Sequence, residues 1–437
     1  MKQVIFLFFL AILCCGNASA QRKKRNVKEE IRSPKQELVY QDKNYLPTIK
    51  SVQFSPLGKE GDLPLISLNS DEKLNLVFDD LRADVRNFYF SIEHCNYNWE
   101  PSRVSPLEYA AGYNEDRIEN FTSSKSTAQA YTNYNLTFPT EYVKPKISGN
   151  YLLKVYEDAD KNRLILTRKF YVYRDLIQVQ ASLLQSPNVN NRASHQKINV
   201  TIKTNALTIT NPQRDIHVVA IQNRRNDYQL ETVDPLFIGN NEVRYEKTET
   251  LDFKGNKEFH YVDLRSFRLA AATIRNIRQD SIPYVTLTVD EDESGISYAS
   301  TFDENGKFYI RNLDLEDDAA NSSDYANVEF SLKTNQQPKG RIYLAGAFNN
   351  FIPSEEFELK KDEASLVWKL TTKLKQGLYD YDYIFVDENG KSFTDTFSNS
   401  HFETGNSYQI LIYNRRPGTY WDELSGYSEI TTNKKQN

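Results

Sequence analysis

Two side chains that could perform nucleophilic chemistry, His94 and Cys95, are neighbours in the chain. A cysteine becomes a strong nucleophile when a histidine within hydrogen-bond reach takes its proton. Phe88, Phe90 and Ile92 recur with a period of two, which predicts a β-strand that runs into this pair. Neighbours on a strand project to opposite faces. We therefore expect Cys95 to be a small buried hydrophobe and His94 to be hydrogen-bonded locally, not a catalytic pair.

The rest of the chain has no recognisable catalytic or metal-binding pattern. It lacks the G-x-S-x-G, Walker, G-x-G-x-x-G and H-E-x-x-H motifs. Its five histidines are scattered, and no Cys/His spacing suits zinc. The formal charge of −5, with both signs mixed, gives no reason to expect nucleic acid. We therefore expect no enzyme, no catalytic residues, no metal and no cofactor.

A long irregular segment, residues 102–138, follows the predicted strand and is rich in Ser, Thr, Asn and Tyr. Irregular segments held on a rigid scaffold often carry binding sites. Tyrosine and tryptophan are favoured interface anchors because they are large and amphipathic. The candidate partner-binding residues around the start of this segment are Tyr97, Trp99, Tyr109 and Tyr113. The alternative is that these rings pack inward and that another domain binds the partner.

The amino terminus, residues 1–20, has the pattern of a secretory signal peptide. Lys2 precedes an apolar run of twelve residues, and Ala18-Ser19-Ala20 forms an A-x-A cleavage signal. Twelve residues are too few to span a bilayer as a helix. We expect export and cleavage after Ala20, although Cys14 and Cys15 leave a lipoprotein signal open.

Cleavage would leave Cys95 as the single cysteine, so no internal disulfide can form. Residues 21–43 are polar and predict a linker. The stability of the exported chain must therefore come from hydrophobic cores.

The remaining sequence predicts tandem immunoglobulin-like or early-set β-sandwiches, an all-β fold. Short alternating segments separated by turns support this, among them a hairpin formed by residues 150–173. The predicted divisions are a first domain at 44–175, a second at 176–315, a third at 326–416 and a tail at 417–437.

Three segments carry a family resemblance. HCNYNW at 94–99, EYAAGY at 108–113 and YTNYNLTFP at 131–139 resemble the amino-terminal domain of the type IX secretion system plug proteins of the Bacteroidetes. EFHYVDLRSFR at 258–268 and FDENGKFYI at 302–310 resemble later blocks of that family. The resemblance implies a non-enzymatic periplasmic protein, peripheral to the outer membrane, that binds and plugs the periplasmic end of the translocon.

The predicted third domain resembles a second family, the carbohydrate-binding modules related to glycogen-binding domains. The similarity lies in RIYLAGAFNNF and in the long segment that begins LVWKLTTKLK. It implies a weak candidate sugar site at Asn349, Asn350 and Phe351, where Phe351 takes the place of a tryptophan that stacks on sugars in those modules. A carbohydrate-binding envelope protein is therefore the alternative function, and retention on a glycan column would distinguish the two.

Overall fold

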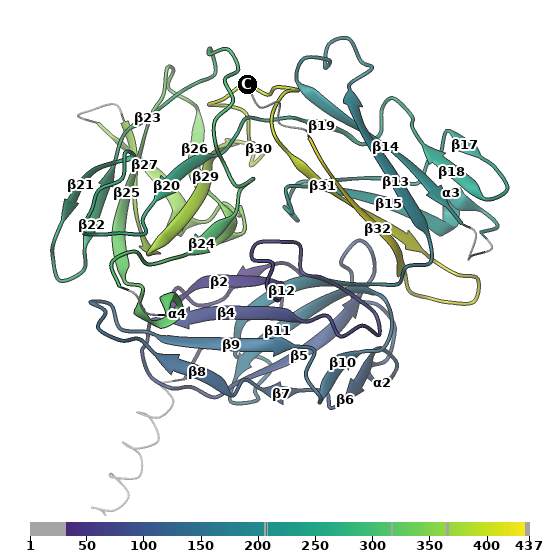
Figure 1. Cartoon of the computed structure of the whole chain (residues 1–437), viewed down its shortest axis with the longest axis horizontal. Helices are drawn as coiled ribbons and strands as arrows, with labels where there is room; N and C mark the ends of the chain where they lie inside the picture. Colours follow the sequence, from purple (N-terminus) through teal and green to yellow (C-terminus); the bar gives the residue numbers. More distant parts are fainter. Residues whose placement is uncertain (1–31, 205–206, 208, 316–317, 364–366, 433–437) are drawn as a thin grey trace, which may run out of the picture.

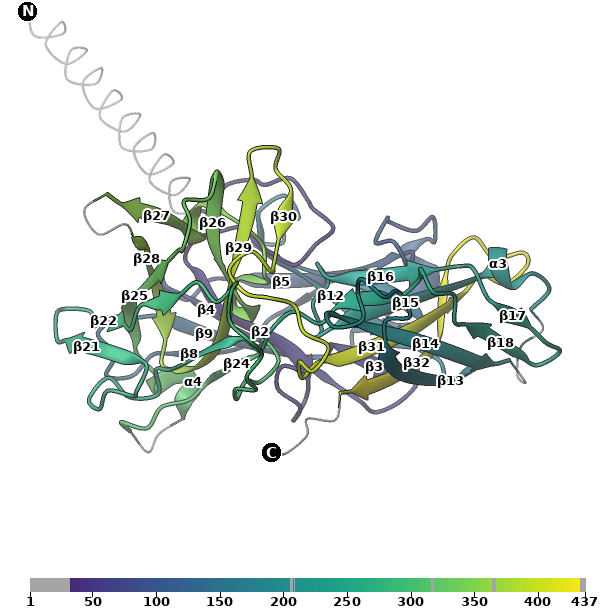
Figure 2. The same cartoon turned by 90° about the horizontal axis from the view of Figure 1, so that it is seen from above.

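The computed structural model describes residues 32–432 except 205–206, 208, 316–317 and 364–366. Within these residues the chain is almost entirely β, which confirms the predicted fold class. Three groups of strands surround a common centre, with the first domain below and the third and second above it (Figure 1). Seen from above, the third and second domains lie side by side (Figure 2). The predicted signal peptide and the first half of the predicted linker, residues 21–31, lie outside the described residues.

The described helices are single turns that connect strands. No described helix is both long and apolar enough to cross a membrane. The helices are α2 (Pro106–Tyr109), α3 (Pro212–Asp215) and α4 (Ala319–Ser322).

The first domain is a sandwich of two antiparallel sheets with a short strand added to one of them in parallel. One sheet has the order β1 (Lys43–Asn44), β12 (Leu164–Tyr173), β11 (Gly149–Glu157), β5 (Phe88–Cys95) and β7 (Asp116–Arg117), with β3 (Leu65–Ser67) beside β12. The other has the order β2 (Ile49–Pro56), β4 (Leu74–Asp80), β9 (Thr132–Phe138) and β8 (Asn120–Ser123). The hairpin predicted at 150–173 is the β11–β12 pair.

The second domain is built from two parts of the chain that are far apart in sequence. One sheet comprises β13 (Gln178–Gln185), β14 (His195–Lys203), β18 (Glu242–Tyr245), β17 (Phe237–Ile238) and β19 (Asp252–Lys254). The other has the order β16 (Gln229–Thr232), β15 (Ile216–Gln222), β31 (Ser407–Asn414) and β32 (Glu423–Thr431). The strands β31 and β32 therefore belong with β15, and the predicted tail at 417–437 contains a full strand of this sheet.

The third domain is one continuous eleven-stranded sheet that encloses its own core. The path of the sheet is β20 (His260–Asp263), β29 (Gly377–Asp387), β26 (Gly340–Ala345), β27 (Glu358–Asp362), β28 (Val367–Lys375), β25 (Tyr325–Lys333), β22 (Tyr284–Leu287) and β21 (Ile274–Arg278). Off this path are β23 (Asp290–Glu291), β24 (Phe308–Ile310) and β30 (Ser392–Phe393). The predicted boundaries at 315 and 416 thus do not coincide with the sheets, because β20 to β24 pair with the third domain and not with the second.

An apolar core joins the first and second domains. Cys95, Leu152 and Tyr171 on the outer face of the first domain pack in one cluster with Val219 and Leu411 of the second. As a result β11 and β12 are buried on both faces along almost their whole length. The two domains therefore share a core, and their contact resembles the interior of a single domain.

A polar cluster joins the first and third domains. The Asp79 carboxylate on β4 lies 2.7 Å from the Lys375 ammonium on β28. The hydroxyl of Tyr325 donates to the same carboxylate at 2.6 Å, and Asn133 donates to its other oxygen at 2.7 Å. The ammonium also lies 4.0 Å from the centre of the Tyr131 ring. The Asp79 carboxylate and the Lys375 ammonium are thus each held by several hydrogen-bond or ring partners.

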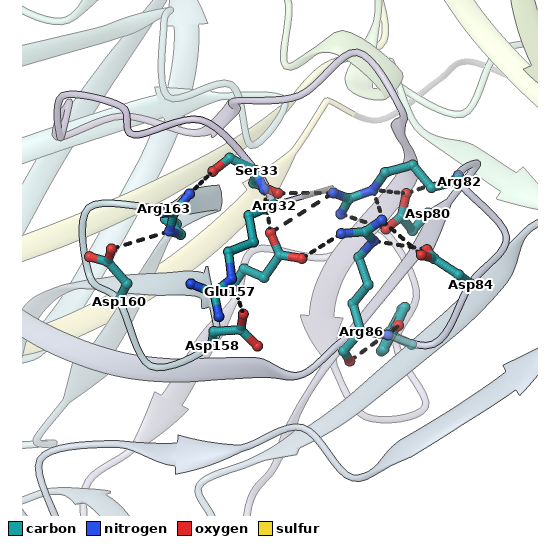
Figure 3. A network of polar contacts seen from close by, with 11 residues as sticks. Arg32, Ser33, Asp80, Arg82, Asp84, Arg86, Glu157, Asp158, Asp160 and Arg163 are labelled. Carbon is teal, nitrogen blue, oxygen red and sulfur yellow. Dashed lines mark hydrogen bonds and ion pairs between the residues drawn. The ribbon is translucent and has the colours of Figure 1, made fainter. Parts of the chain in front are cut away.

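The segment before β1 is fastened to the first domain by an arginine–carboxylate network (Figure 3). Glu157 accepts hydrogen bonds at 2.7 Å from the Arg86 guanidinium and at 2.7 Å from the backbone N–H of Ser33. The Ser33 hydroxyl accepts one from Arg82 at 2.9 Å, and the Ser33 carbonyl accepts one from Arg163. This network holds the segment around Ser33 against the surface of the first domain.

A candidate partner-binding surface on the first domain

The loop after β5 turns back on itself within six residues. Cys95 and Pro101 form an isolated β-bridge, and the N–H of Trp99 donates to the carbonyl of Asn96 at 2.9 Å. Trp99 has a φ of +67°, a left-handed conformation that is unusual for a bulky residue. This conformation directs the ring inward, where it is buried edge-on against Tyr171 at 5.3 Å. Trp99 is therefore a core residue and not the surface anchor that the sequence suggested.

Tyr97 on the same loop contacts the second domain. Its ring stacks on His217 of β15 with centroids 3.9 Å apart and an interplanar angle of 23°. Its backbone N–H donates to the Asp422 carboxylate at 3.3 Å. Tyr97 is an anchor, but the surface that it contacts belongs to its own chain.

His94 and Cys95 lie on opposite sides of their sheet, as the strand geometry predicted. His94 accepts from the Ser102 hydroxyl at Nδ1 over 2.8 Å and donates from Nε2 to the Ser148 carbonyl over 3.4 Å. Burial lowers the pKa of His94 to about 4, so the ring is neutral near pH 7. Cys95 lies in the core between the domains, where burial raises the pKa of the thiol to about 12. These two residues therefore do not form a nucleophile–base pair.

The helix α2 begins at a capping box that the sequence encodes. The Ser105 side chain accepts from the backbone N–H of Leu107 at 3.3 Å, and the N–H of Ser105 donates to Glu108 at 3.0 Å. Tyr109 at the end of the helix is buried, and its hydroxyl donates to the carbonyl of Ile92 at 3.3 Å. Tyr109 is therefore also a core residue, whereas Leu107 on the same helix is 77% exposed.

An exposed tyrosine pair lies beyond α2. The short strands β6 (Ala110–Gly112) and β10 (Val143–Pro145) pair antiparallel and bring Tyr113 beside Tyr142, with ring centroids 5.7 Å apart. Gly112 makes this approach possible, since its φ is +89° and a Cβ there would lie 2.0 Å from the Tyr142 carbonyl oxygen. Tyr113 is 67% exposed, so it is the one sequence-predicted anchor that faces solvent. Tyr142 was missed because no local pattern links it to Tyr113.

A groove of about 1000 Å³ lies between the first and second domains. Tyr97, Arg103, His217, Arg415 and Tyr420 are among the residues that line it. The Tyr420 hydroxyl lies 3.3 Å from both carboxylate oxygens of Glu108 on α2, so the groove adjoins that helix. Four exposed side chains are here called the aromatic surface: Leu107, Tyr113 and Tyr142 of the first domain, and Tyr420 from the loop between β31 and β32 of the second.

The three residues of the candidate sugar site do not form an open platform. Asn349 is buried and uses its side chain locally, accepting from the Gly346 N–H at 2.9 Å and donating to the Leu344 carbonyl at 2.8 Å. Asn350 and Phe351 adopt left-handed conformations with φ of 56° and 57°. The Phe351 ring is 6% exposed and lies 4.2 Å from the guanidinium of Arg225 in the second domain. Phe351 thus stacks on an arginine of its own chain, and its ring is not open to a sugar.

No metal centre is evident in the part of the chain that the structure describes, since no three His, Cys, Asp or Glu residues there could hold an ion.

Comparison with known proteins agrees with the sequence resemblance. No curated protein matches this chain. The crystal structure of a hypothetical protein from Parabacteroides merdae ATCC 43184 is similar, with a TM-score of 0.86 and 27% sequence identity, over 91% of this chain and 100% of that one. Residues 49–174 match the family described as type 9 secretion system plug protein 1st domain. The chain therefore contains, at residues 49–174, a first domain of the type 9 secretion system plug proteins.

Proposed function

We propose that this chain is a non-enzymatic component of the type IX secretion system that acts in the periplasm. In this proposal it binds the periplasmic end of the outer-membrane translocon and keeps it closed. The observation that carries the proposal is the family match over residues 49–174. Three of the four residues of the aromatic surface, Leu107, Tyr113 and Tyr142, lie within the matched residues, so the matched domain supplies most of the proposed contact.

The way in which the three domains are joined is compatible with a plug. A body that closes a pore must keep its shape under load, and large apolar interfaces between domains prevent relative motion. Here the first and second domains share a core, and the first and third are joined by the buried Asp79–Lys375 pair.

The aromatic surface has the composition of a reversible interface. Such interfaces are moderate in area and are anchored by a few aromatic residues within a polar rim. Tyr113 and Tyr142 supply two adjacent rings, while Glu108 and Arg103 supply nearby charges. We assign Tyr113 and Tyr142 as the principal anchors and Leu107 as a peripheral contact.

The decisive experiment is an affinity pull-down from detergent-solubilised envelopes, with the mature chain as bait and the bound chains identified by mass spectrometry. The proposal expects an outer-membrane translocon protein of the type IX system among them. A double variant, Tyr113→Ala with Tyr142→Ala, should weaken this capture at least about tenfold, as expected when two interface anchors are truncated. Its melting temperature should stay the same because both rings are exposed.

The chain provides a closely matched control in Phe302, which lies in the third domain and is 66% exposed. Phe302→Ala should leave the capture unchanged. If the double variant and the control capture the translocon equally well, the aromatic surface is not the contact. If deletion of the gene leaves the outer membrane no more permeable to a large antibiotic, the plugging role is wrong.

A further inference from the structure

A small cavity of about 140 Å³ lies where the three domains meet. Arg168 and Lys169 line it from the first domain, Arg224 and Arg225 from the second, and Lys307 from the turn before β24 in the third. Asp42 and Asp62 are the acidic residues in its lining, so cations outnumber anions there. The excess of positive charge is formed only when all three domains are in place.

Three of these five cations have carboxylate partners. Arg225 pairs with Asp227 at 2.7 Å. Lys307 contacts Asp62 at 2.8 Å, and the same carboxylate lies 3.5 Å from Arg224. Their charges are therefore largely neutralised within the protein.

Arg168 and Lys169 differ, because neither has a carboxylate within ion-pair distance among the described residues. Arg168 is 5% exposed, and its guanidinium donates to the Thr167 carbonyl at 2.7 Å and to the Asn44 side-chain oxygen at 2.7 Å. Lys169 is 9% exposed, and the one group placed against its ammonium is the Trp99 ring, at 4.3 Å.

Asp42 is the nearest acid to both, but its oxygens are already engaged. They accept from the backbone N–H of Lys169 at 2.7 Å and from the Asn226 amide at 2.9 Å. Burial lowers the pKa of the Arg168 guanidinium to about 10 and also lowers the pKa of Lys169, and in each case Asp42 offsets only part of the effect. Buried charges in proteins are normally paired with an opposite charge, so two buried cations that have no carboxylate partner beside one cavity are suited to binding an anion.

We propose that this junction is a binding site for a small oxyanion, a carboxylate or phosphate group, with Lys169 as its principal ligand and Arg168 as the supporting charge. The cavity has room for a group of only a few heavy atoms, which excludes a nucleotide or a sugar chain from its interior. Because the lining comes from three domains, a bound anion would hold them together. This site is independent of translocon binding.

The test uses the mature chain in a buffer without phosphate or carboxylate, titrated separately with sodium phosphate, sodium acetate and sodium chloride at matched ionic strength. We expect phosphate or acetate to raise the melting temperature saturably, by about 3 °C at a concentration 100-fold above the Kd, while chloride does not. Equilibrium dialysis with labelled phosphate or acetate should find one bound anion per chain. A shift from either oxyanion identifies the class, and no saturable shift from either one overturns the proposal.

Lys169→Gln removes the charge and keeps much of the buried stem, so it should abolish both the shift and the bound anion. Lys197→Gln is the matched control, since Lys197 is also a buried lysine, but its ammonium donates to the Ile198 carbonyl at 2.9 Å away from the cavity. This variant should respond to the anion like the wild type. If Lys169→Gln still binds one anion with unchanged affinity, the site is elsewhere. Should that variant not fold, the dialysis of the wild-type chain alone decides the proposal, because an empty site refutes it.

Discussion

Asp79 and Lys375 are 296 residues apart in the chain, yet their charged groups lie 2.7 Å from one another with almost no access to solvent. Burial lowers the pKa of Lys375, and the adjacent Asp79 carboxylate opposes that effect. The pair lies at the contact between the first and third domains. The free-energy cost of breaking this pair therefore reports how strongly the first and third domains are held together.

Removal of one member of this pair should be costly. Asp79→Asn leaves the Lys375 ammonium buried without a counter-charge, which typically destabilises a protein by about 3–5 kcal/mol. The double variant Asp79→Asn with Lys375→Met should recover much of that loss, as measured by denaturant unfolding. Glu291→Gln, which breaks the exposed Lys333–Glu291 pair, should cost about 0.5 kcal/mol or less. An equally small effect of Asp79→Asn would show that the buried pair does not hold the domains.

The network around Glu157 should make the first domain sensitive to acid. Burial tends to raise the pKa of Glu157, but the bonds from Ser33 and Arg86 prevail and lower it. The folded state thus favours the ionised carboxylate, so its stabilisation is present above the unfolded pKa near 4.5 and is lost as the pH falls through the lower, folded pKa. Glu157→Gln should destabilise the chain by about 1–3 kcal/mol at pH 7. The difference between the melting temperatures of the two proteins should shrink as the pH falls below 4.5, and a constant difference from pH 3 to 7 would contradict this linkage.

Asp380 should have the opposite pH dependence. Burial, together with the nearby charges of Asp303 and Glu304, raises the pKa of its carboxyl from the usual 3.8 to about 7. The folded state therefore holds the proton more tightly, and the wild type loses stability as the pH rises from about 4 to about 7. Asp380→Asn still accepts the N–H bonds from Glu304 and Gly306, at 2.7 and 3.0 Å in the wild type, and carries no charge.

This variant should be more stable than the wild type at pH 8, by up to about 4 kcal/mol, and equal to it near pH 4. Melting temperatures across this pH range provide the measurement. A variant that is less stable than the wild type at pH 8 would mean that Asp380 is ionised and well solvated in the folded state.

Cys95 should be chemically inert in the folded protein. Only the thiolate is nucleophilic, and burial raises the pKa of this thiol to about 12. Iodoacetamide at pH 8 should alkylate Cys95 in denaturant but not in the native chain, as shown by intact mass. Cys95→Ser should cost about 1–2 kcal/mol because it places a hydroxyl in an apolar core. Partner capture should remain intact, and its loss in a well-folded variant would reveal a functional thiol.

The features that sequence alone predicted are local ones. The hairpin β11–β12 is encoded by two alternating apolar segments and a turn, so it forms as neighbouring residues dictate. The pairing of β15 with β31 has no local sequence signal, because it joins residues far apart in the chain, such as Val219 and Leu411. The composition of β15 does not specify its partner, since other strands in the chain have a similar composition.

The candidate surface was predictable only in part for a similar reason. Composition identified an aromatic-rich segment, but the direction of each ring depends on backbone conformation and on distant partners. Trp99 turns inward because of its left-handed φ, and Tyr97 meets a histidine more than 100 residues away. Tyr142 could be connected with Tyr113 only through the β6–β10 pairing.

The return of β31 and β32 to the second domain also sets the order in which the domains can form when the chain folds from its amino terminus. The third domain lies within the second along the chain, between β19 and β31. As the chain emerges amino terminus first, the first domain can close early, and the third can close next. The sheet that contains β15 cannot be completed without residues 407–431, so its apolar face stays open until almost the whole chain is available. A chain that stops after residue 406, 31 residues short, would therefore carry two finished domains and one permanently open sheet, which exposes it to proteases and to association with other chains.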